Sequence, residues 1–169
     1  YHQYNQTAKH YGILKTFGLK PVDLDDVVSR TKMLKVAVDS ENLQIKKENG
    51  LEIFYQSEVP FSGWVKRSTP QISALIQIKE GKANGALEVL YSNGRKCMSQ
   101  IFTDGKIVSA VSWKPNGEMC LITGIKEGRG VTVFYDGQGN ESHRIFYEKG
   151  KHKQIRFNGK SEKSDSGVE

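Results

Sequence analysis

The amino-acid sequence predicts a mainly β protein: an antiparallel meander of tandem β-hairpin repeats with a period of 22–24 residues, preceded by a short helical N-terminal segment. Three recurring features predict this fold. An aromatic residue recurs every 22 residues, and a β-branched residue stands two positions before it, as on one face of a strand. A glycine turn precedes each such strand, and a turn rich in Asn and Gly follows it. The aromatic row is Tyr91, Trp113, Tyr135 and Phe157; the β-branched residues are Val89, Val111, Val133 and Ile155; the preceding turns are Glu80-Gly81, Asp104-Gly105, Glu127-Gly128 and Lys149-Gly150.

Residues 1–42 differ from the repeats and form a helical or extended N-terminal segment. Residues 11–17 are compatible with a short helix that ends at Gly18, because Pro21 would interrupt a longer one. Asp23 is a candidate N-cap for a second helix, in which Leu24 and Val27 share one face. The sequence therefore predicts one or two short helices before about residue 33.

Residues 43–159 form the predicted β-hairpin repeat domain. Asn49-Gly50 is a strong two-residue hairpin signal, since a type I′ turn requires positive φ at both central positions. Residues 160–169 contain one apolar side chain, so they are predicted to be a disordered tail. The predicted strands cover residues 33–38, 43–47, 51–56, 63–67, 72–79, 86–91, 96–103, 107–113, 118–126, 131–135, 142–149 and 153–157.

The positive charge is spread almost evenly along the chain. The net charge is +6, and residues 1–50, 51–100, 101–140 and 141–169 contribute +2, +2, 0 and +2. Nucleic-acid binders usually concentrate Lys and Arg in a patch, and the linear sequence shows none, so nucleic acid is not an expected partner. No stretch approaches the ~20 apolar residues that span a bilayer. A secreted or envelope location and a cytoplasmic one both stay open.

Cysteine and histidine give no sign of a metal site. Cys97 and Cys120 occupy equivalent places in neighbouring units, about 9–10 Å apart across an intervening strand, which predicts two free thiols. The histidines at positions 2, 10, 143 and 152 lack metal-ligand spacing. No nucleophile elbow, phosphate loop or dinucleotide motif occurs. The sequence predicts no enzyme, no cofactor and no catalytic residue.

The aromatic row is the main candidate for a site, and it has two interpretations. An exposed row of rings could bind a partner, because rings offer a large contact area at low entropic cost. The favoured interpretation is a buried spine that the row forms with its β-branched companions, since those neighbours are apolar rather than polar.

Two repeat units resemble the variant MORN-type repeats of YwqK-like antitoxin proteins. Residues 102–106 (Phe-Thr-Asp-Gly-Lys), Trp113 and Asn116-Gly117 follow the repeat, as do residues 78–82 with Tyr91 and Asn93-Gly94. The resemblance covers roughly residues 49–159, although residues 69–71 (Thr-Pro-Gln) replace one expected Asn-Gly turn. It implies a non-enzymatic protein-binding module, which in some members is thought to neutralise a toxin encoded nearby.

The leading expectation is therefore a protein-binding repeat module whose partner is a toxin, that is, an antitoxin or immunity protein. The alternative is a structural or envelope-associated surface protein that contacts the anionic lipid of a membrane through its modest positive charge.

Overall fold

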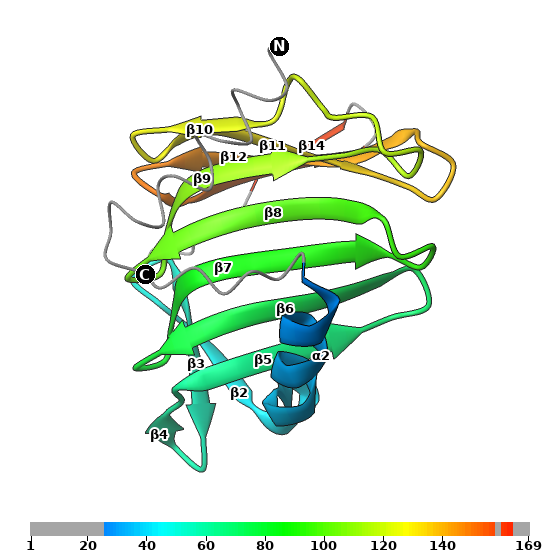
Figure 1. Ribbon diagram of the computed structural model, residues 1–169. Coiled ribbons are helices and arrows are strands. Elements are labelled where there is room, and N and C mark those ends of the chain that lie inside the picture. Colours follow the sequence, from blue (N-terminus) through cyan, green and yellow to red (C-terminus); the bar gives the residue numbers. More distant parts are fainter. Residues whose placement is uncertain (1–25, 158–159, 164–169) are drawn as a thin grey trace.

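Antiparallel hairpins dominate the protein, as the sequence predicts. The computed structural model describes residues 26–157 and 160–163. Within them lie one α-helix, a 3₁₀ turn and three sheets of six, five and three strands (Figure 1). The mainly β class with a short N-terminal helix is confirmed. No helix among the described residues has the length and apolar character needed to cross a membrane.

The helix and the strands occur in the following order in the three sheets. The helix is α2 (Val27–Val36), and the 3₁₀ turn is η1 (Ser40–Asn42). The six-stranded sheet contains β1 (Val38–Asp39), β5 (Gly63–Ser68), β6 (Ile72–Lys79), β7 (Lys82–Tyr91), β8 (Lys96–Thr103) and β9 (Lys106–Ser112). The five-stranded sheet contains β10 (Gly124–Lys126), β11 (Arg129–Tyr135), β12 (Glu141–Glu148), β13 (Lys151–Phe157) and β14 (Lys160–Lys163). The three-stranded sheet contains β2 (Gln44–Glu48), β3 (Leu51–Gln56) and β4 (Val59–Pro60).

Helix α2 ends later than the sequence predicts and replaces most of the strand expected over residues 33–38. Asp26 is its N-cap and accepts a hydrogen bond from the Ser29 amide at 2.8 Å. Met33 and Leu34 pack against the buried cluster of Ala37 and Leu75, and this packing favours the helix over a strand. Asp23 and the helix expected over residues 11–17 lie outside the described residues.

The N-terminal segment is not separated from the sheet at residue 42. Strand β1 pairs parallel with β5, with Val38 opposite Val65, so residues before 43 join the six-stranded sheet. At the other end, Lys160–Lys163 was predicted to lie in a disordered tail but forms β14, paired antiparallel with β13. An edge strand offers backbone hydrogen bonds that a polar segment can use without burying apolar side chains. For this reason the polar composition of the segment did not predict β14.

The predicted single meander is divided between two sheets at residues 113–123. Instead of a strand over 118–126, only Gly124–Lys126 pairs with β11, and Trp113 and Met119 form an isolated bridge. The Thr123 hydroxyl accepts a hydrogen bond from the Val133 amide at 2.9 Å. A side chain thus takes the place of a backbone partner, and the ladder starts one residue later.

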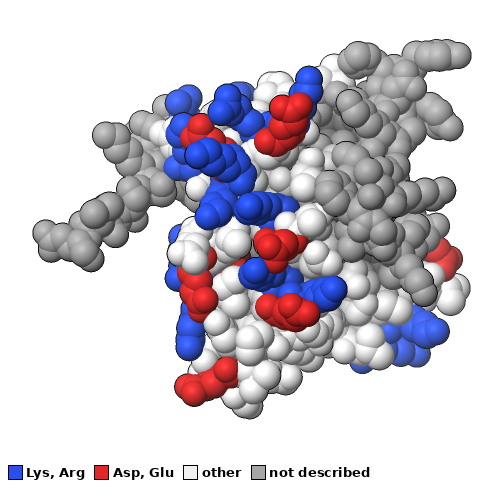
Figure 2. All heavy atoms as spheres, turned by 90° about the vertical axis from the view of Figure 1, so that its left-hand side faces the viewer, with Lys and Arg blue, Asp and Glu red and all other residues white. Residues whose placement is uncertain are grey.

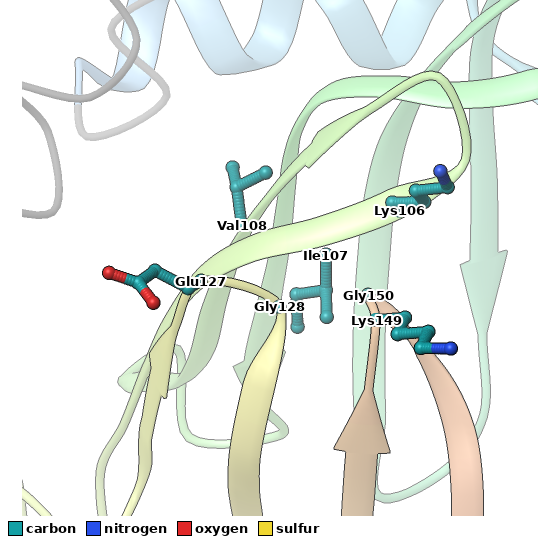
Figure 3. Close-up of a pocket in the computed structure, with 7 residues that line it drawn as sticks. All are labelled: Lys106, Ile107, Val108, Glu127, Gly128, Lys149 and Gly150. Carbon is teal, nitrogen blue, oxygen red and sulfur yellow. The ribbon is translucent and has the colours of Figure 1, made fainter.

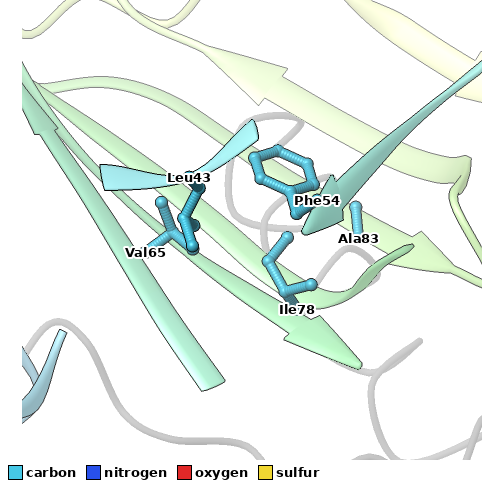
Figure 4. Packing of buried hydrophobic residues seen from close by; sticks show 5 residues of the cluster. All are labelled: Leu43, Phe54, Val65, Ile78 and Ala83. Atoms are coloured by element: carbon cyan, nitrogen blue, oxygen red, sulfur yellow. The ribbon is translucent and has the colours of Figure 1, made fainter. Parts of the chain in front are cut away.

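Several buried clusters join the three sheets in pairs. Leu43, Phe54, Val65, Ile78 and Ala83 pack together where β3 crosses the six-stranded sheet (Figure 4). Phe134 of the five-stranded sheet packs against a second buried cluster that includes Val89 and Met98. The two larger sheets are therefore joined by side-chain packing as well as by the chain itself.

Candidate functional site

The aromatic row runs from the core to the surface. Tyr91 is 6% exposed and lies in the cluster of Val89, Cys97 and Met98, whereas Phe157 is 45% exposed. Trp113 and Tyr135 are half-buried between them. The structure thus brings no row of four equivalent rings to the surface, and among the four only Phe157 is exposed.

The β-branched companions of the row do not form one continuous spine. Val89 pairs with Met98, which pairs with Ser112. Directly paired residues in antiparallel strands point to the same face, so Val111, next to Ser112, points to the opposite face from Val89. The physical reason is register: β7 and β9 are offset so that the position equivalent to 89 is 112, a step of 23 rather than 22.

Each cysteine of the repeat is linked to a tyrosine of the aromatic row. The Tyr91 hydroxyl donates to the Trp113 carbonyl at 2.6 Å, and burial raises the pKa of Tyr91 and that of the neighbouring Cys97. The Tyr135 hydroxyl donates to Cys120 Sγ at 3.0 Å.

Both thiols are free and buried, in agreement with the predicted geometry. Burial alone would raise the pKa of Cys120, but hydrogen bonds from Tyr135 and from the amides of Thr123 and Ile122 outweigh it and lower that pKa.

Three rings on neighbouring strands of the five-stranded sheet form an aromatic stack: Phe134, His143 and Phe157. The His143 ring lies 4.3 Å from the Phe134 ring and 5.3 Å from the Phe157 ring, centroid to centroid. The Ser142 hydroxyl lies 2.9 Å from His143 Nδ1, and burial lowers the pKa of His143. Phe134 anchors one end of the stack in the core, and Phe157 is exposed at the other.

Five glycine turns of the hairpins, each one Asn, Glu, Asp or Lys followed by Gly, gather at one end of the strands. This hairpin-turn face consists of Asn49-Gly50, Glu80-Gly81, Asp104-Gly105, Glu127-Gly128 and Lys149-Gly150, each with positive φ at both positions. Figure 2 shows it directly, with basic and acidic side chains interleaved. Lys82 pairs with Asp104 at 2.8 Å, and this hydrogen bond lowers the pKa of the Asp104 carboxyl and raises that of Lys82.

A pocket of about 390 Å³ opens on the hairpin-turn face where the two larger sheets meet. This junction pocket is lined by Lys106, Ile107 and Val108 of β9, by Glu127 and Gly128, and by Lys149 and Gly150. Figure 3 shows the Lys106 and Lys149 side chains on one side and the Glu127 carboxylate on the other.

Two backbone hydrogen bonds, from Ile107 N to Gly150 O at 3.0 Å and from Gly150 N to Gly128 O at 2.8 Å, hold the three pocket segments together. Ile107 is 0% exposed and gives the pocket an apolar floor.

Neither the aromatic stack nor the junction pocket is indicated by the repeat pattern of the sequence. Phe134 and His143 stand outside the 22-residue row, and their contact depends on a register shift between Phe134 and Tyr135. Lys149 offered a signal, because it stands where the other glycine turns have an acidic residue or Asn. Among the described residues, no group of three or more His, Cys, Asp or Glu is placed to hold a metal ion.

Comparison with known proteins identifies no family. No family model matches the chain, and no curated protein matches it. Solved structures of TarM resemble it weakly. A mutant S. aureus TarM in complex with fondaparinux, α-GlcNAc-glycerol and UDP has a TM-score of 0.31 and 11% identity over 85% of this chain. A second TarM structure has a TM-score of 0.32 and 13% identity over 92%. The chain spans 26% of the length of each. At these TM-scores the likeness carries no argument about function.

Proposed function

We propose that this chain is a non-enzymatic protein-binding module. The observation that carries the proposal is the aromatic stack, which ends in the exposed ring of Phe157. Aromatic residues contribute disproportionately to the binding energy of protein interfaces.

The stack also limits the entropic cost of binding. Phe157 is held against His143, and His143 lies nearly parallel to Phe134, with 8° between the ring planes. A ring that is already held in place loses less conformational freedom when a partner covers it. On the opposite face of β13, the Arg156 guanidinium lies 4.8 Å from the centre of the Phe146 ring. Arginine is also enriched at such interfaces, so a partner that encloses this strand would meet favourable side chains on both faces.

The resemblance to variant MORN-type repeats of YwqK-like antitoxins supports a toxin as the partner. On this proposal the chain is an antitoxin or immunity protein that covers a functional surface of the toxin. Family analogy of this kind suggests a partner class and supplies no contact residues.

Affinity capture of the full chain from its native lysate tests the proposal. One stoichiometric protein that is retained by the wild type and lost with Phe157→Ala is the expected result. Val59→Ala is the matched control, because Val59 is 64% exposed on β4, away from the stack. Recovery with the membrane fraction would favour the anionic-lipid alternative, and turnover of a substrate by the purified chain without a partner would contradict both.

A further inference from the structure

Three turns among the described residues contain an asparagine followed by a glycine. They are Asn49-Gly50, Asn93-Gly94 and Asn116-Gly117, and all six residues are exposed. Asparagine is chemically labile. The backbone nitrogen of the next residue can attack its side-chain amide carbon, and glycine hinders that attack least because it has no Cβ. The three pairs are alike in sequence and in exposure, so their hydrogen bonds decide which of them reacts.

Hydrogen bonds hold the turn at Asn93. The Asn93 Oδ1 accepts from the Arg95 amide at 3.0 Å, and its Nδ2 donates to the Pro115 carbonyl at 3.1 Å. The Gly94 amide nitrogen, which is the nucleophile in this reaction, donates to the Tyr91 carbonyl at 2.9 Å. Both reacting groups are therefore engaged with other partners.

The turn at Asn116 is held in the same way. The Asn116 Oδ1 accepts from the Glu118 amide at 2.9 Å, and the Gly117 amide donates to the Lys114 carbonyl at 2.9 Å. In both turns the side chain has to leave its partner, and the amide its acceptor, before the two groups can meet. Breaking two hydrogen bonds of ordinary strength slows the reaction by about tenfold or more.

The turn at Asn49 has neither restraint. Among residues 26–157 and 160–163, no hydrogen bond involves the Asn49 side chain or the Gly50 N–H. Three other glycine amides of the hairpin-turn face do donate to carbonyls, those of Gly81, Gly105 and Gly150. Asn49 therefore combines an unrestrained side chain with an available nucleophile.

Lys151 places a positive charge on the peptide group that reacts. Its Nζ donates to the Asn49 carbonyl oxygen, and its Cδ lies 3.4 Å from the point where a Cβ on Gly50 would stand. The Gly50 nitrogen attacks as the deprotonated amide, in which negative charge spreads onto that carbonyl oxygen. A cation bound to the oxygen stabilises this form and so promotes the attack.

We infer that Asn49 is a site of spontaneous covalent modification, at which the side-chain amide becomes a carboxylate. The Gly50 nitrogen gives its proton to hydroxide and bonds to Asn49 Cγ. The Cγ–Nδ2 bond breaks, and Nδ2 takes a proton from water and leaves as ammonia. Water then opens the five-membered imide at either carbonyl, which yields aspartate or isoaspartate. The net reaction consumes one water and releases one ammonia, and no oxidant is needed.

The reaction loosens the β2–β3 hairpin. Isoaspartate adds a methylene to the backbone of a two-residue turn, so Glu48 no longer fits opposite Leu51 in the ladder. All residues of β2 are exposed, and few buried contacts therefore oppose its release. This inference goes beyond the proposed protein-binding function and is independent of it, because the Phe157→Ala capture concerns another region of the chain.

Peptide mapping by mass spectrometry tests the inference on the purified full chain, incubated at mildly alkaline pH. We expect conversion of amide to acid at Asn49 to be at least about tenfold faster than at Asn93 or Asn116, because only the latter two must first break hydrogen bonds. The matched control is the same chain in concentrated urea. The three rates should converge there, because the hydrogen bonds of the fold are lost.

Three substitutions test the part of Lys151, which acts as a positioning residue. Lys151→Gln removes the charge and should slow the reaction at Asn49 by about fivefold, the effect of one charge near another in water. Lys151→Arg keeps the charge and should retain most of the wild-type rate. Lys32→Gln removes a charge from an exposed position of α2 and should leave the rate unchanged. Melting curves establish that all three variants are folded.

Three results would overturn the inference. One is a rate at Asn93 or Asn116 in the folded chain that equals or exceeds the rate at Asn49. Another is a difference between the three sites that persists in urea, which would trace it to the sequence instead of the fold. The third is an equal rate in Lys151→Gln and the wild type, which would show that the bound cation does not promote the attack.

Discussion

Replacing Gly150 with Ala tests how the two larger sheets are joined. Gly150 has φ +76°, and a Cβ built there would lie 2.6 Å from Lys106 Cβ and 3.1 Å from Lys106 Cγ. Lys106 Cβ is fixed to the β9 backbone, so the contact is relieved only if β9 and the β12–β13 turn move apart. That movement weakens the hydrogen bonds that Gly150 makes with Ile107 and Gly128.

The expected cost follows from these two effects. Left-handed φ costs a residue with a Cβ roughly 1–2 kcal/mol. Two weakened backbone hydrogen bonds add roughly 1 kcal/mol each. Gly150→Ala should therefore lower the free energy of unfolding by about 3–4 kcal/mol. Gly94 is the matched control: its φ is +80°, but a Cβ there meets nothing within 4 Å. Gly94→Ala should cost only the conformational part, about 1–2 kcal/mol.

Urea denaturation followed by tryptophan fluorescence measures both variants against the wild type. A common slope with a lower midpoint would indicate a change in stability at constant exposed surface. Equal loss of unfolding free energy in Gly150→Ala and Gly94→Ala would contradict this prediction. The cost of Gly150→Ala would then come from the turn conformation alone, with no part from the close approach of the two sheets.

Three further predictions concern side chains. Tyr91→Phe removes the buried hydrogen bond to the Trp113 carbonyl and should lower the free energy of unfolding by about 1–2 kcal/mol in the same urea assay. Cys97 and Cys120 should both react with a thiol reagent in denaturant without prior reduction; a count below two would contradict the free thiols. Burial lowers the pKa of His143, so the unfolded chain binds a proton that the native state resists, and stability should fall as pH drops below about 6.5. Melting curves at pH 7.5 and 5.5 measure this effect. The melting temperature of His143→Phe should fall less between the two pH values than that of the wild type, and an equal fall would show that His143 is not the group responsible.

The repeat spacing predicted the hairpins well because turn chemistry is local. Residues 51–56, 72–79 and 96–103 were predicted as strands with the bounds that the structure shows. Those strands are bounded by turns at Asn49-Gly50, Glu80-Gly81 and Asp104-Gly105, whose left-handed conformations require little beyond the residues themselves.

The sequence could not predict which face of a sheet each side chain points to, or which sheet each strand joins. Both depend on the register between strands. The ladder shifts at Val89/Leu90 and again at Phe134/Tyr135, and each shift changes which side chains face the core. Phe134, which stands outside the aromatic row, packs against the Val89 cluster.

The central claim is that the exposed end of the aromatic stack binds a protein. Titration calorimetry of the captured partner against the wild type, Phe157→Ala and Val59→Ala tests it most directly. We expect Phe157→Ala to weaken binding by about 2 kcal/mol, roughly thirtyfold, while its melting curve stays close to that of the wild type, and Val59→Ala to bind unchanged. Equal affinity of all three proteins for the partner would contradict the claim.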